Sequence, residues 1–463
     1  MRISNKFLNI KGTVLDKEQL QSYMEKSAVN AEITNISNKS TYPIPRLNDN
    51  FKFIEKTYIL LNEHIKKGID IYPAGEWLLD NFYIIEETVK KITREMTLKK
   101  YKNFPGIASG IYKGYSRIYV LASEIVAYTE NKIEDDILKL AVLAYQRKKT
   151  LSMEEIWNLW LFLDIALIEN IRAVCEKIYL SHMQKYKVES IVERLIDKKD
   201  SNKQKFKTIK DEYKTQMSYK EIKYPFIEYM SYKLKRYGKQ GIAYLNILEE
   251  QVNKMGLTVS EAIKKEHFDI AIQKVLIGNS ITSIREINRI NFLNLFEEIN
   301  GVEEILKQDP AETYDKMDYK TKEYYRNRIK TLSKQTKLSE IYIAKKTLEL
   351  ANKANNQKQR HIGYYLIDKG INELAVAIGG KTKYRTERPY ILYVYILPLI
   401  LSGLLGAFFY SISNLPLAII TTILSYVPIS EICIQILNYC LGKTVKPKLI
   451  PKLDFMRRYT KKI

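Results

Sequence analysis

The sequence predicts an all-α protein: a multi-helix cytoplasmic domain followed by a C-terminal transmembrane helical hairpin. Three observations support this class. Apolar residues recur three and four positions apart through most of the chain, as on one face of a helix. No stretch shows the alternation of apolar and polar residues that is typical of a half-buried strand. Residues 389–430 contain no Lys, Arg, Asp, Glu or His, and a run of this length can cross a bilayer twice.

The first part of the chain is predicted to contain a polar segment and a helical subdomain. Residues 1–48 are weakly patterned, with one predicted helix from Leu15 to Ala28 and an extended linker at residues 42–45, which read Tyr-Pro-Ile-Pro. Residues 49–182 form a helical subdomain whose apolar residues step by three and four. Within it, a capping box begins a helix at Ser152.

The chain is also predicted to be helical between this subdomain and the hairpin. Residues 183–224 are the most charged stretch and form either a solvated helix or a connector. Residues 225–388 form a second helical subdomain, in which Asp309 and Pro310 supply the N-cap and the first residue of a helix. Residues 443–463 form a basic cytoplasmic tail after the hairpin.

The predicted hairpin occupies residues 389–442. Its spans cover about residues 391–411 and 415–437, and the sequence leaves open whether the second span ends before or after Glu431. A helical hairpin buried in a soluble domain is the alternative, although soluble cores rarely need so long a run without charge. Small side chains in the first span would let another helix approach closely. These residues are Ser402, Gly403, Gly406 and Ala407.

The distribution of charged residues predicts where the chain lies relative to the membrane. Lysines and arginines flank both spans and the turn between the spans is uncharged, so both termini are predicted to lie in the cytoplasm, with the chain multi-pass in the inner (plasma) membrane. The net charge of +22 is explained by attraction to anionic membrane lipid, and no nucleic-acid-binding motif is visible. Three cysteines suggest no disulfide framework, and the first residues lack the apolar region of a cleavable signal.

One predicted helix carries a candidate binding cluster of Glu76, Trp77, Asp80 and Asn81. The last three are spaced so that they share a helix face. An aromatic ring beside a carboxylate and an amide is one way in which proteins hold sugars. The sequence favours the alternative, a core tryptophan whose polar neighbours bond an adjacent loop.

A second candidate group contains Glu169, Asn170 and Arg172, for which a buried polar clamp between helices is favoured over a substrate site. The histidines lack the spacing of a metal site, so surface or capping roles are predicted for them. They are His64, His182, His267 and His361. The sequence predicts no catalytic residue, no metal and no cofactor.

Six segments carry a resemblance to a known family. They are IYPAGEWLLDNFYIIEE (71–87), FPGIASGIYKGYSRIYVLASEIVAYTE (104–130), AYQRKKTLSMEEIWNLWLFLDIALIENIR (144–172), DPAETYDKMDYKTKEYYR (309–326), HIGYYLIDKG (361–370) and PISEICIQILNYCLGKTVKPKLIPKLDF (428–455). In this order they resemble segments near the start of the cyclic β-1,2-glucan synthases. The resemblance covers roughly residues 50–455.

This resemblance implies a role beside an enzyme. In that family a cytoplasmic glycosyltransferase domain follows the Pro-x-Leu-Asp-Phe stretch, here residues 451–455, and uses UDP-glucose with a divalent metal held by Asp-x-Asp. Neither Asp-x-Asp nor the family's Gln-x-x-Arg-Trp motif occurs in this sequence, so no independent activity is expected. The chain is expected to be a truncated, non-catalytic scaffold and membrane anchor for a glycosyltransferase domain or polypeptide encoded downstream. The alternative is a stand-alone membrane-anchored helical protein that binds an acidic partner or anionic lipid.

Overall fold

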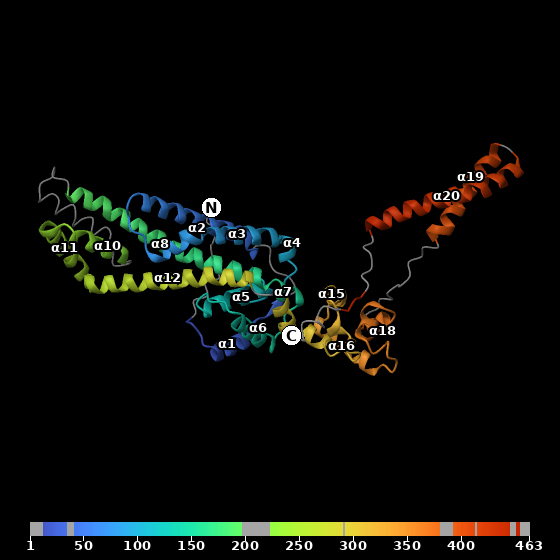
Figure 1. Cartoon of the computed structure of the whole chain (residues 1–463), viewed down its shortest axis with the longest axis horizontal. Helices are drawn as coiled ribbons and strands as arrows, with labels where there is room; N and C mark the ends of the chain where they lie inside the picture. Colours follow the sequence, from blue (N-terminus) through green and yellow to red (C-terminus); the bar gives the residue numbers. More distant parts are fainter. Residues whose placement is uncertain are drawn as a thin grey trace, which may run out of the picture. The chain divides into compact units, whose positions relative to one another are not determined.

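Helices dominate the structure (Figure 1), which confirms the predicted fold class. The computed structural model describes residues 13–34, 41–196, 223–289, 292–379, 392–412, 414–444 and 451–453. The chain divides into two compact units, residues 1–299 and residues 300–463. Within the described residues, the one sheet is a two-residue antiparallel pair of β1 (Ile33–Thr34) and β2 (Gly106–Ile107).

The first unit is built from helices that range from four to 38 residues in length. In chain order they are α1 (Lys17–Asn30), α2 (Ile44–Lys66), α3 (Pro73–Glu95), α4 (Leu98–Tyr101), α5 (Arg117–Tyr128), α6 (Asp135–Gln146), α7 (Met153–Trp157), α8 (Leu159–Ile196), α10 (Tyr224–Lys235), α11 (Gly238–Asn253), α12 (Val259–Arg289) and α13 (Phe292–Ile299).

Helix α8 is the central element of this unit. It is 38 residues long, and α2, α3, α5, α10 and α12 all pack against it. Leu161, Phe162 and Leu163 are all fully buried, although consecutive side chains point about 100° apart around a helix. The first half of α8 is therefore enclosed on every side, as expected for a helix that is apolar all round.

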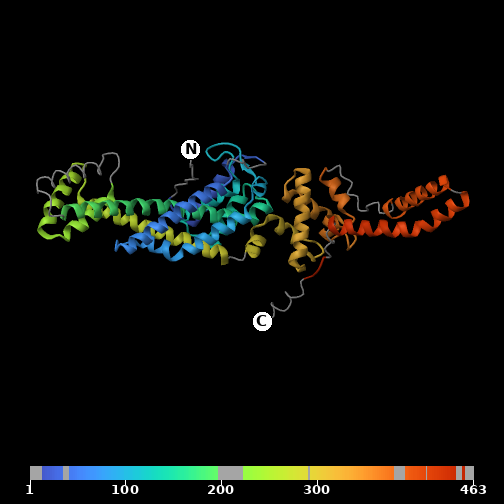
Figure 2. The same cartoon turned by 90° about the horizontal axis from the view of Figure 1, so that it is seen from above.

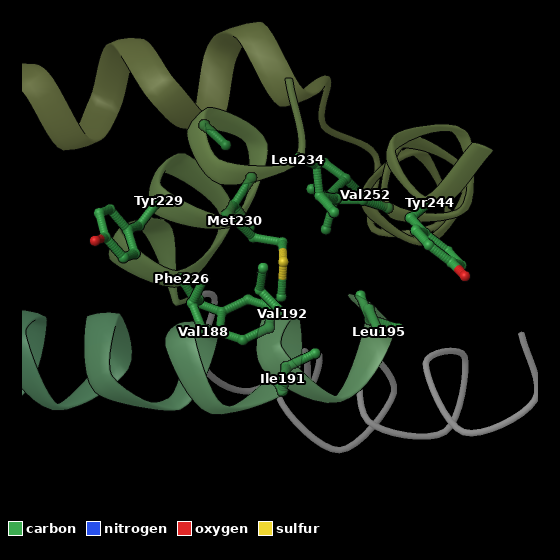
Figure 3. Close-up of a cluster of buried hydrophobic side chains, with 13 residues drawn as sticks. Val188, Ile191, Val192, Leu195, Phe226, Tyr229, Met230, Leu234, Tyr244 and Val252 are labelled. Atoms are coloured by element: carbon green, nitrogen blue, oxygen red, sulfur yellow. The ribbon is translucent and has the colours of Figure 1, made fainter. Parts of the chain in front are cut away.

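The far end of α8 contributes to a separate hydrophobic cluster (Figure 3). There Val188 and Val192 pack with Phe226 and Met230 of α10. Helix α12 packs against α10 at this end and also against α3 and α8, so residues 224–299 belong to the first unit. The sequence instead places a boundary at 183–224. Helix α8 continues through residue 183 to Ile196, and residues 197–222 lie outside the described residues.

Two predictions near the N-terminus are refined by the structure. Residues 42–45 were expected to be extended, but α2 begins at Ile44, with prolines in its first turn, where a missing N–H removes no helical hydrogen bond. The helix predicted from Leu15 to Ala28 is confirmed as α1, which packs against α6 through its buried apolar face. The predicted capping box at Ser152 is confirmed, because its hydroxyl accepts from the Glu155 N–H and the Glu155 carboxylate accepts from the Ser152 N–H.

The second unit has shorter helices followed by the hairpin. Its elements are α14 (Gly301–Leu306), the 3₁₀ turn η2 (Tyr314–Lys316), α15 (Tyr319–Thr336), α16 (Glu340–Lys353), α17 (Ile362–Ile367), α18 (Ile371–Ala377), the π-helical turn η3 (Leu392–Ile396), α19 (Leu397–Ile412) and α20 (Leu415–Thr444). The predicted helix start at Asp309 is wrong. Asp309 accepts the N–H groups of Thr313 and Tyr314 in a turn, and the next α-helix is capped by Asp318.

Helices α19 and α20 form a hairpin and lie side by side (Figures 1 and 2). Two stretches of it are long and apolar enough to cross a membrane, Val394–Ile412 and Leu415–Cys440. Only 17% and 11% of these stretches are covered by other parts of the protein. Core helices of soluble proteins are mostly covered, so the hairpin resembles a membrane element more than a buried one.

The small residues of α19 divide between two faces. Ser402 and Gly406 are buried against α20, whereas Gly403 and Ala407 are exposed. A Cβ atom at Gly406 would overlap the Thr422 hydroxyl, and its next neighbour would be the Ala418 carbonyl oxygen at 3.1 Å. Gly406 therefore permits the close contact between the two helices of the hairpin.

Replacing Gly406 by isoleucine is expected to separate α19 from α20. Overpacking of this kind costs about 1–3 kcal/mol. The matched control is Gly403→Ile, because a Cβ atom at Gly403 meets no atom within 4 Å. Thermal denaturation of the detergent-purified chain should give a lower midpoint for Gly406→Ile than for Gly403→Ile. Equal midpoints would show that the contact at Gly406 does not hold the hairpin together.

Candidate functional site

Helix α3 presents the first candidate cluster on two different faces. Glu76 and Asp80 are exposed and line a cleft of about 580 Å³ beside Asp70 and Ile69. Trp77 is turned toward α12, where its ring lies 3.7 Å from the position a Cβ atom would take at Gly278. The structure therefore does not bring the Trp77 ring and the Asp80 carboxylate to one binding site.

Asn81 joins Trp77 at the contact with α12. Its amide donates to the Trp77 carbonyl oxygen at 2.9 Å, and its side-chain oxygen accepts from Arg285 of α12 at 2.5 Å. Both hydrogen-bonding ends of this buried amide are occupied by neighbouring protein groups. Trp77 and Asn81 therefore fasten α3 to α12, while Glu76 and Asp80 face the open cleft.

Glu169 lies at a buried junction of three helices. Its carboxylate accepts from Arg46 Nε of α2 at 2.7 Å and from the Tyr119 hydroxyl of α5 at 2.5 Å. Burial raises the pKa of Glu169, although the Arg46 charge and the two hydrogen bonds oppose this shift. The Glu169 carboxylate thus connects α2, α5 and α8. The more distant of its two donors, Arg46, is 123 residues away in sequence.

The two neighbours of Glu169 contact other parts of the first unit. The Asn170 amide donates to the side-chain oxygen of Asn131 at 2.7 Å. The Arg172 guanidinium lies over the Phe53 ring, 4.7 Å from its centre, and forms an ion pair with Glu176. Each side chain of the predicted group has its own protein partner, and the three do not converge on a common opening.

Sequence reasoning missed a fully buried ion pair between α5 and α7. Arg117 donates from Nε and Nη2 to the two carboxylate oxygens of Glu155, at 2.9 and 2.5 Å. Arg117 is 5% exposed and Glu155 is not exposed at all. Both residues lie within the quoted segments 104–130 and 144–172, and this shared placement is the only sequence signal that links them.

A second missed feature is a buried group of ionisable side chains where α8, α10 and α12 meet. Lys185 donates to the Asp70 carbonyl oxygen at 2.8 Å and lies over the Tyr72 ring. The Tyr72 hydroxyl donates to Glu228 at 2.9 Å. Burial, together with the Glu228 charge, raises the pKa of Glu266 to about 7. Burial also lowers the pKa of Lys185 to about 8, although surrounding carboxylates oppose this shift.

Two histidines meet beside this group, contrary to the surface or capping roles predicted for them. His64 and His182 are buried, and their Nδ1 atoms are hydrogen-bonded at 2.9 Å. Burial, with the nearby Lys185 charge, lowers the pKa of His182 to about 3, so this imidazole is neutral at pH 7. The pair joins α2 to α8 across 118 positions of sequence. Within the described residues, no three histidine, cysteine or acidic side chains are grouped to hold a metal ion.

The second unit contains a hydrogen-bonded relay of Asp309, His361 and Tyr325. The buried Asp309 carboxylate accepts from His361 Nδ1 at 2.7 Å, and His361 Nε2 is 3.0 Å from the Tyr325 hydroxyl. Burial alone would raise the pKa of Asp309, but hydrogen bonds from His361 and from backbone N–H groups lower it. Asp309 is therefore charged, which assigns a proton to His361 Nδ1 and directs Nε2 toward Tyr325.

This relay opens onto a cavity of about 350 Å³. Its polar walls include Tyr325, His361 and Lys358, and residues 451–453 form another wall. Gly363 is required beside the relay, because a Cβ atom there would overlap the Tyr325 hydroxyl. The quoted segments 309–326, 361–370 and 428–455 thus meet at one place, although they are far apart in sequence.

Comparison with known proteins finds a curated relative. The chain is 24% identical over 342 residues to the cyclic beta-(1,2)-glucan synthase NdvB of Rhizobium meliloti. The matched part is 72% of this chain and 12% of that protein, so the chain spans about an eighth of the relative's length. No family model matches the chain. The similarity confirms the resemblance to the N-terminal region of cyclic β-1,2-glucan synthases that the sequence motifs predict.

Proposed function

We propose that this chain is the membrane-anchored helical part of a cyclic β-1,2-glucan synthase system. In this role it holds a UDP-glucose-dependent glycosyltransferase domain, on the same polypeptide or on a separate one, against the inner face of the membrane. The observation that carries the proposal is the similarity to the Rhizobium meliloti synthase, which extends over 342 residues of this chain.

The exposed surface of the hairpin supports membrane anchoring. Leu404, Phe408, Ile423 and Leu424 are each at least 60% exposed, and they lie on both helices. Exposing such side chains to water is unfavourable by about 25 cal/mol for each Å² of apolar surface, whereas lipid covers them. The described backbone of α19 and α20 is helical, so apart from the break in the pattern at Pro428 its N–H and C=O groups bond within each helix, as a membrane span requires.

The connections of the hairpin support an arrangement with both flanks on one side of the membrane. Residues before the hairpin, up to 379, and residues 451–453 after it belong to the same unit. Leu453 is paired with Met317. A hairpin whose two ends join one body enters and leaves the bilayer at the same face. The lysines and arginines that flank it favour the cytoplasmic face.

The buried polar contacts of the first unit support a scaffold role. The Glu169, Asn81 and Arg117 contacts each join two or three helices, and each is made between protein groups. Such contacts fix the relative positions of the helices, which gives a rigid body for a partner to dock on.

The proposal is tested with membranes that carry this chain, a glycosyltransferase polypeptide encoded next to it, or both. Membranes with both should incorporate labelled glucose from UDP-glucose, and the two polypeptides should purify together in detergent. Membranes with this chain alone should incorporate none. Incorporation by the chain alone would contradict the non-catalytic role. Equal incorporation with and without the chain would contradict the scaffold role.

The same membranes also test on which side of the bilayer the chain outside the hairpin lies. In sealed inside-out vesicles, added trypsin should digest the first unit and residues 300–379 of the second unit, and leave the hairpin protected. Protection of either of these parts in such vesicles would contradict a cytoplasmic location for the chain outside the hairpin.

A further inference from the structure

The chain leaving the hairpin returns to the helical part of the second unit at residues 451–453, which we call the strap. The Asp318 N–H donates to the Lys452 carbonyl oxygen at 3.0 Å, and the Lys452 N–H donates to the Thr321 hydroxyl oxygen at 3.0 Å. Leu453 pairs with Met317 in an antiparallel bridge. The strap is therefore held at the N-terminal end of α15 through both backbone groups of Lys452.

The strap also completes the cavity beside the relay. Pro451, Lys452 and Leu453 all line that cavity, together with His361 and Tyr325. The cavity consequently has its described shape only while the strap is seated. The position of the strap therefore determines how far the cavity beside the relay is open.

The strap buries little surface. All three of its residues are exposed, and Leu453 remains 43% exposed. Its attachment therefore depends mainly on backbone hydrogen bonds to the start of α15. The net gain from a few hydrogen bonds is of the same order as the entropy lost when three residues are ordered. The seated and released states are therefore closely balanced.

The strap is close in sequence to the second membrane helix. Helix α20 ends at Thr444, so six residues separate it from Pro451. Because a chain segment has a fixed maximum length, a seated strap limits how far the end of α20 can move from α15.

We propose that Pro451–Leu453 is a reversible strap that couples the end of the second membrane helix to the relay cavity. When seated, it holds Leu453 against Met317 and closes the cavity. When released, it opens the cavity. This inference concerns contacts within the chain, so it can fail while the proposed glucan-synthase role stands.

The seated state is tested by a disulfide between Met317→Cys and Leu453→Cys. Paired residues of antiparallel strands have Cα atoms about 4.5–5.5 Å apart, which suits a disulfide. The exposed or half-buried Cys433 and Cys440 are replaced by serine, and the buried Cys175 is kept. Mild oxidation of the full chain in detergent should then give the intrachain disulfide. No disulfide in the native state would overturn the proposal.

Reversibility is tested by the rate at which a maleimide modifies Leu453→Cys in the same background. Thr321→Val removes the hydroxyl that accepts from the strap and should raise this rate about fivefold, the effect of one hydrogen bond. The matched control is Thr331→Val on the same helix, whose hydroxyl donates to the Asn327 carbonyl oxygen and should leave the rate unchanged.

Two results would contradict a reversible strap. Modification of Leu453→Cys as fast in the folded chain as in the denatured chain, in every variant, would show that the strap does not seat. Complete protection in every variant, Thr321→Val included, would show a permanent attachment. Thermal midpoints measured on the same samples separate loss of the strap from loss of the fold.

Discussion

Replacing Asp164 by asparagine is expected to remove the loss of stability that this one side chain causes between about pH 5 and pH 8. Asp164 lies in the enclosed half of α8, and neither of its carboxylate oxygens has a hydrogen-bond partner among the described residues. Burial raises the pKa of Asp164 to about 8, and the charge of Lys91 offsets only part of this shift.

The sign of the effect follows from proton binding. The folded chain keeps the Asp164 proton up to about pH 8, whereas the unfolded chain loses it near the ordinary pKa of 3.8. Between these values the folded state binds more protons, so its stability falls as the pH rises. One pH unit corresponds to about 1.4 kcal/mol, so the wild type should lose up to about 4 kcal/mol relative to Asp164→Asn across three units.

The measurement is the thermal midpoint of the detergent-purified chain at several pH values. The difference in midpoint between Asp164→Asn and wild type should grow steadily from acidic to alkaline pH. Asp80→Asn, which removes an exposed carboxylate, is the control and should follow the wild type at every pH. A constant difference between Asp164→Asn and wild type would mean that Asp164 is ionised in the folded chain.

Replacing Arg117 by methionine is expected to destabilise the first unit by about 3–5 kcal/mol, because the Glu155 carboxylate is left buried without its cation. The desolvation of Glu155 is unusually complete, since its side chain is fully buried. Replacing both residues by methionine should recover most of this loss, because an apolar pair needs no desolvation of charge. About 1 kcal/mol should remain lost, because Glu155 also closes the capping box with Ser152.

The control for this series is Arg289→Met, which breaks the exposed ion pair with Glu286. Exposed pairs contribute about 0–1 kcal/mol, so its thermal midpoint should stay close to that of the wild type. A double variant as unstable as Arg117→Met would show that the loss comes from packing around Arg117 and not from the unpaired Glu155.

Local patterns in the sequence predicted the helices and the hairpin because both depend on neighbouring residues. Apolar spacing specifies a helix face, and the uncharged run at residues 389–430 specifies the hairpin. The prediction failed where tertiary contacts decide. Prolines at 43 and 45 suit an extended chain and a first helical turn equally well, and the structure has the helix.

The candidate sites were harder to predict because their partners are distant in sequence. Arg46 and Glu169 are 123 residues apart, and Asp309 and His361 are 52 apart. Spacing placed Trp77 and Asp80 near each other on a helix, but packing against α12 takes Trp77 away from the cleft that Asp80 lines. The resemblance identified the segments that meet, though not the atoms that join them.

Helix α8 joins two hydrophobic clusters in one continuous rod. At about 1.5 Å per residue, its 38 residues extend roughly 57 Å. Helix α10 packs against its last turns, and α2, α5 and α12 also pack against it. A single helix therefore sets the distance between the two ends of the first unit, and a break within α8 would separate two clusters that now move as one body.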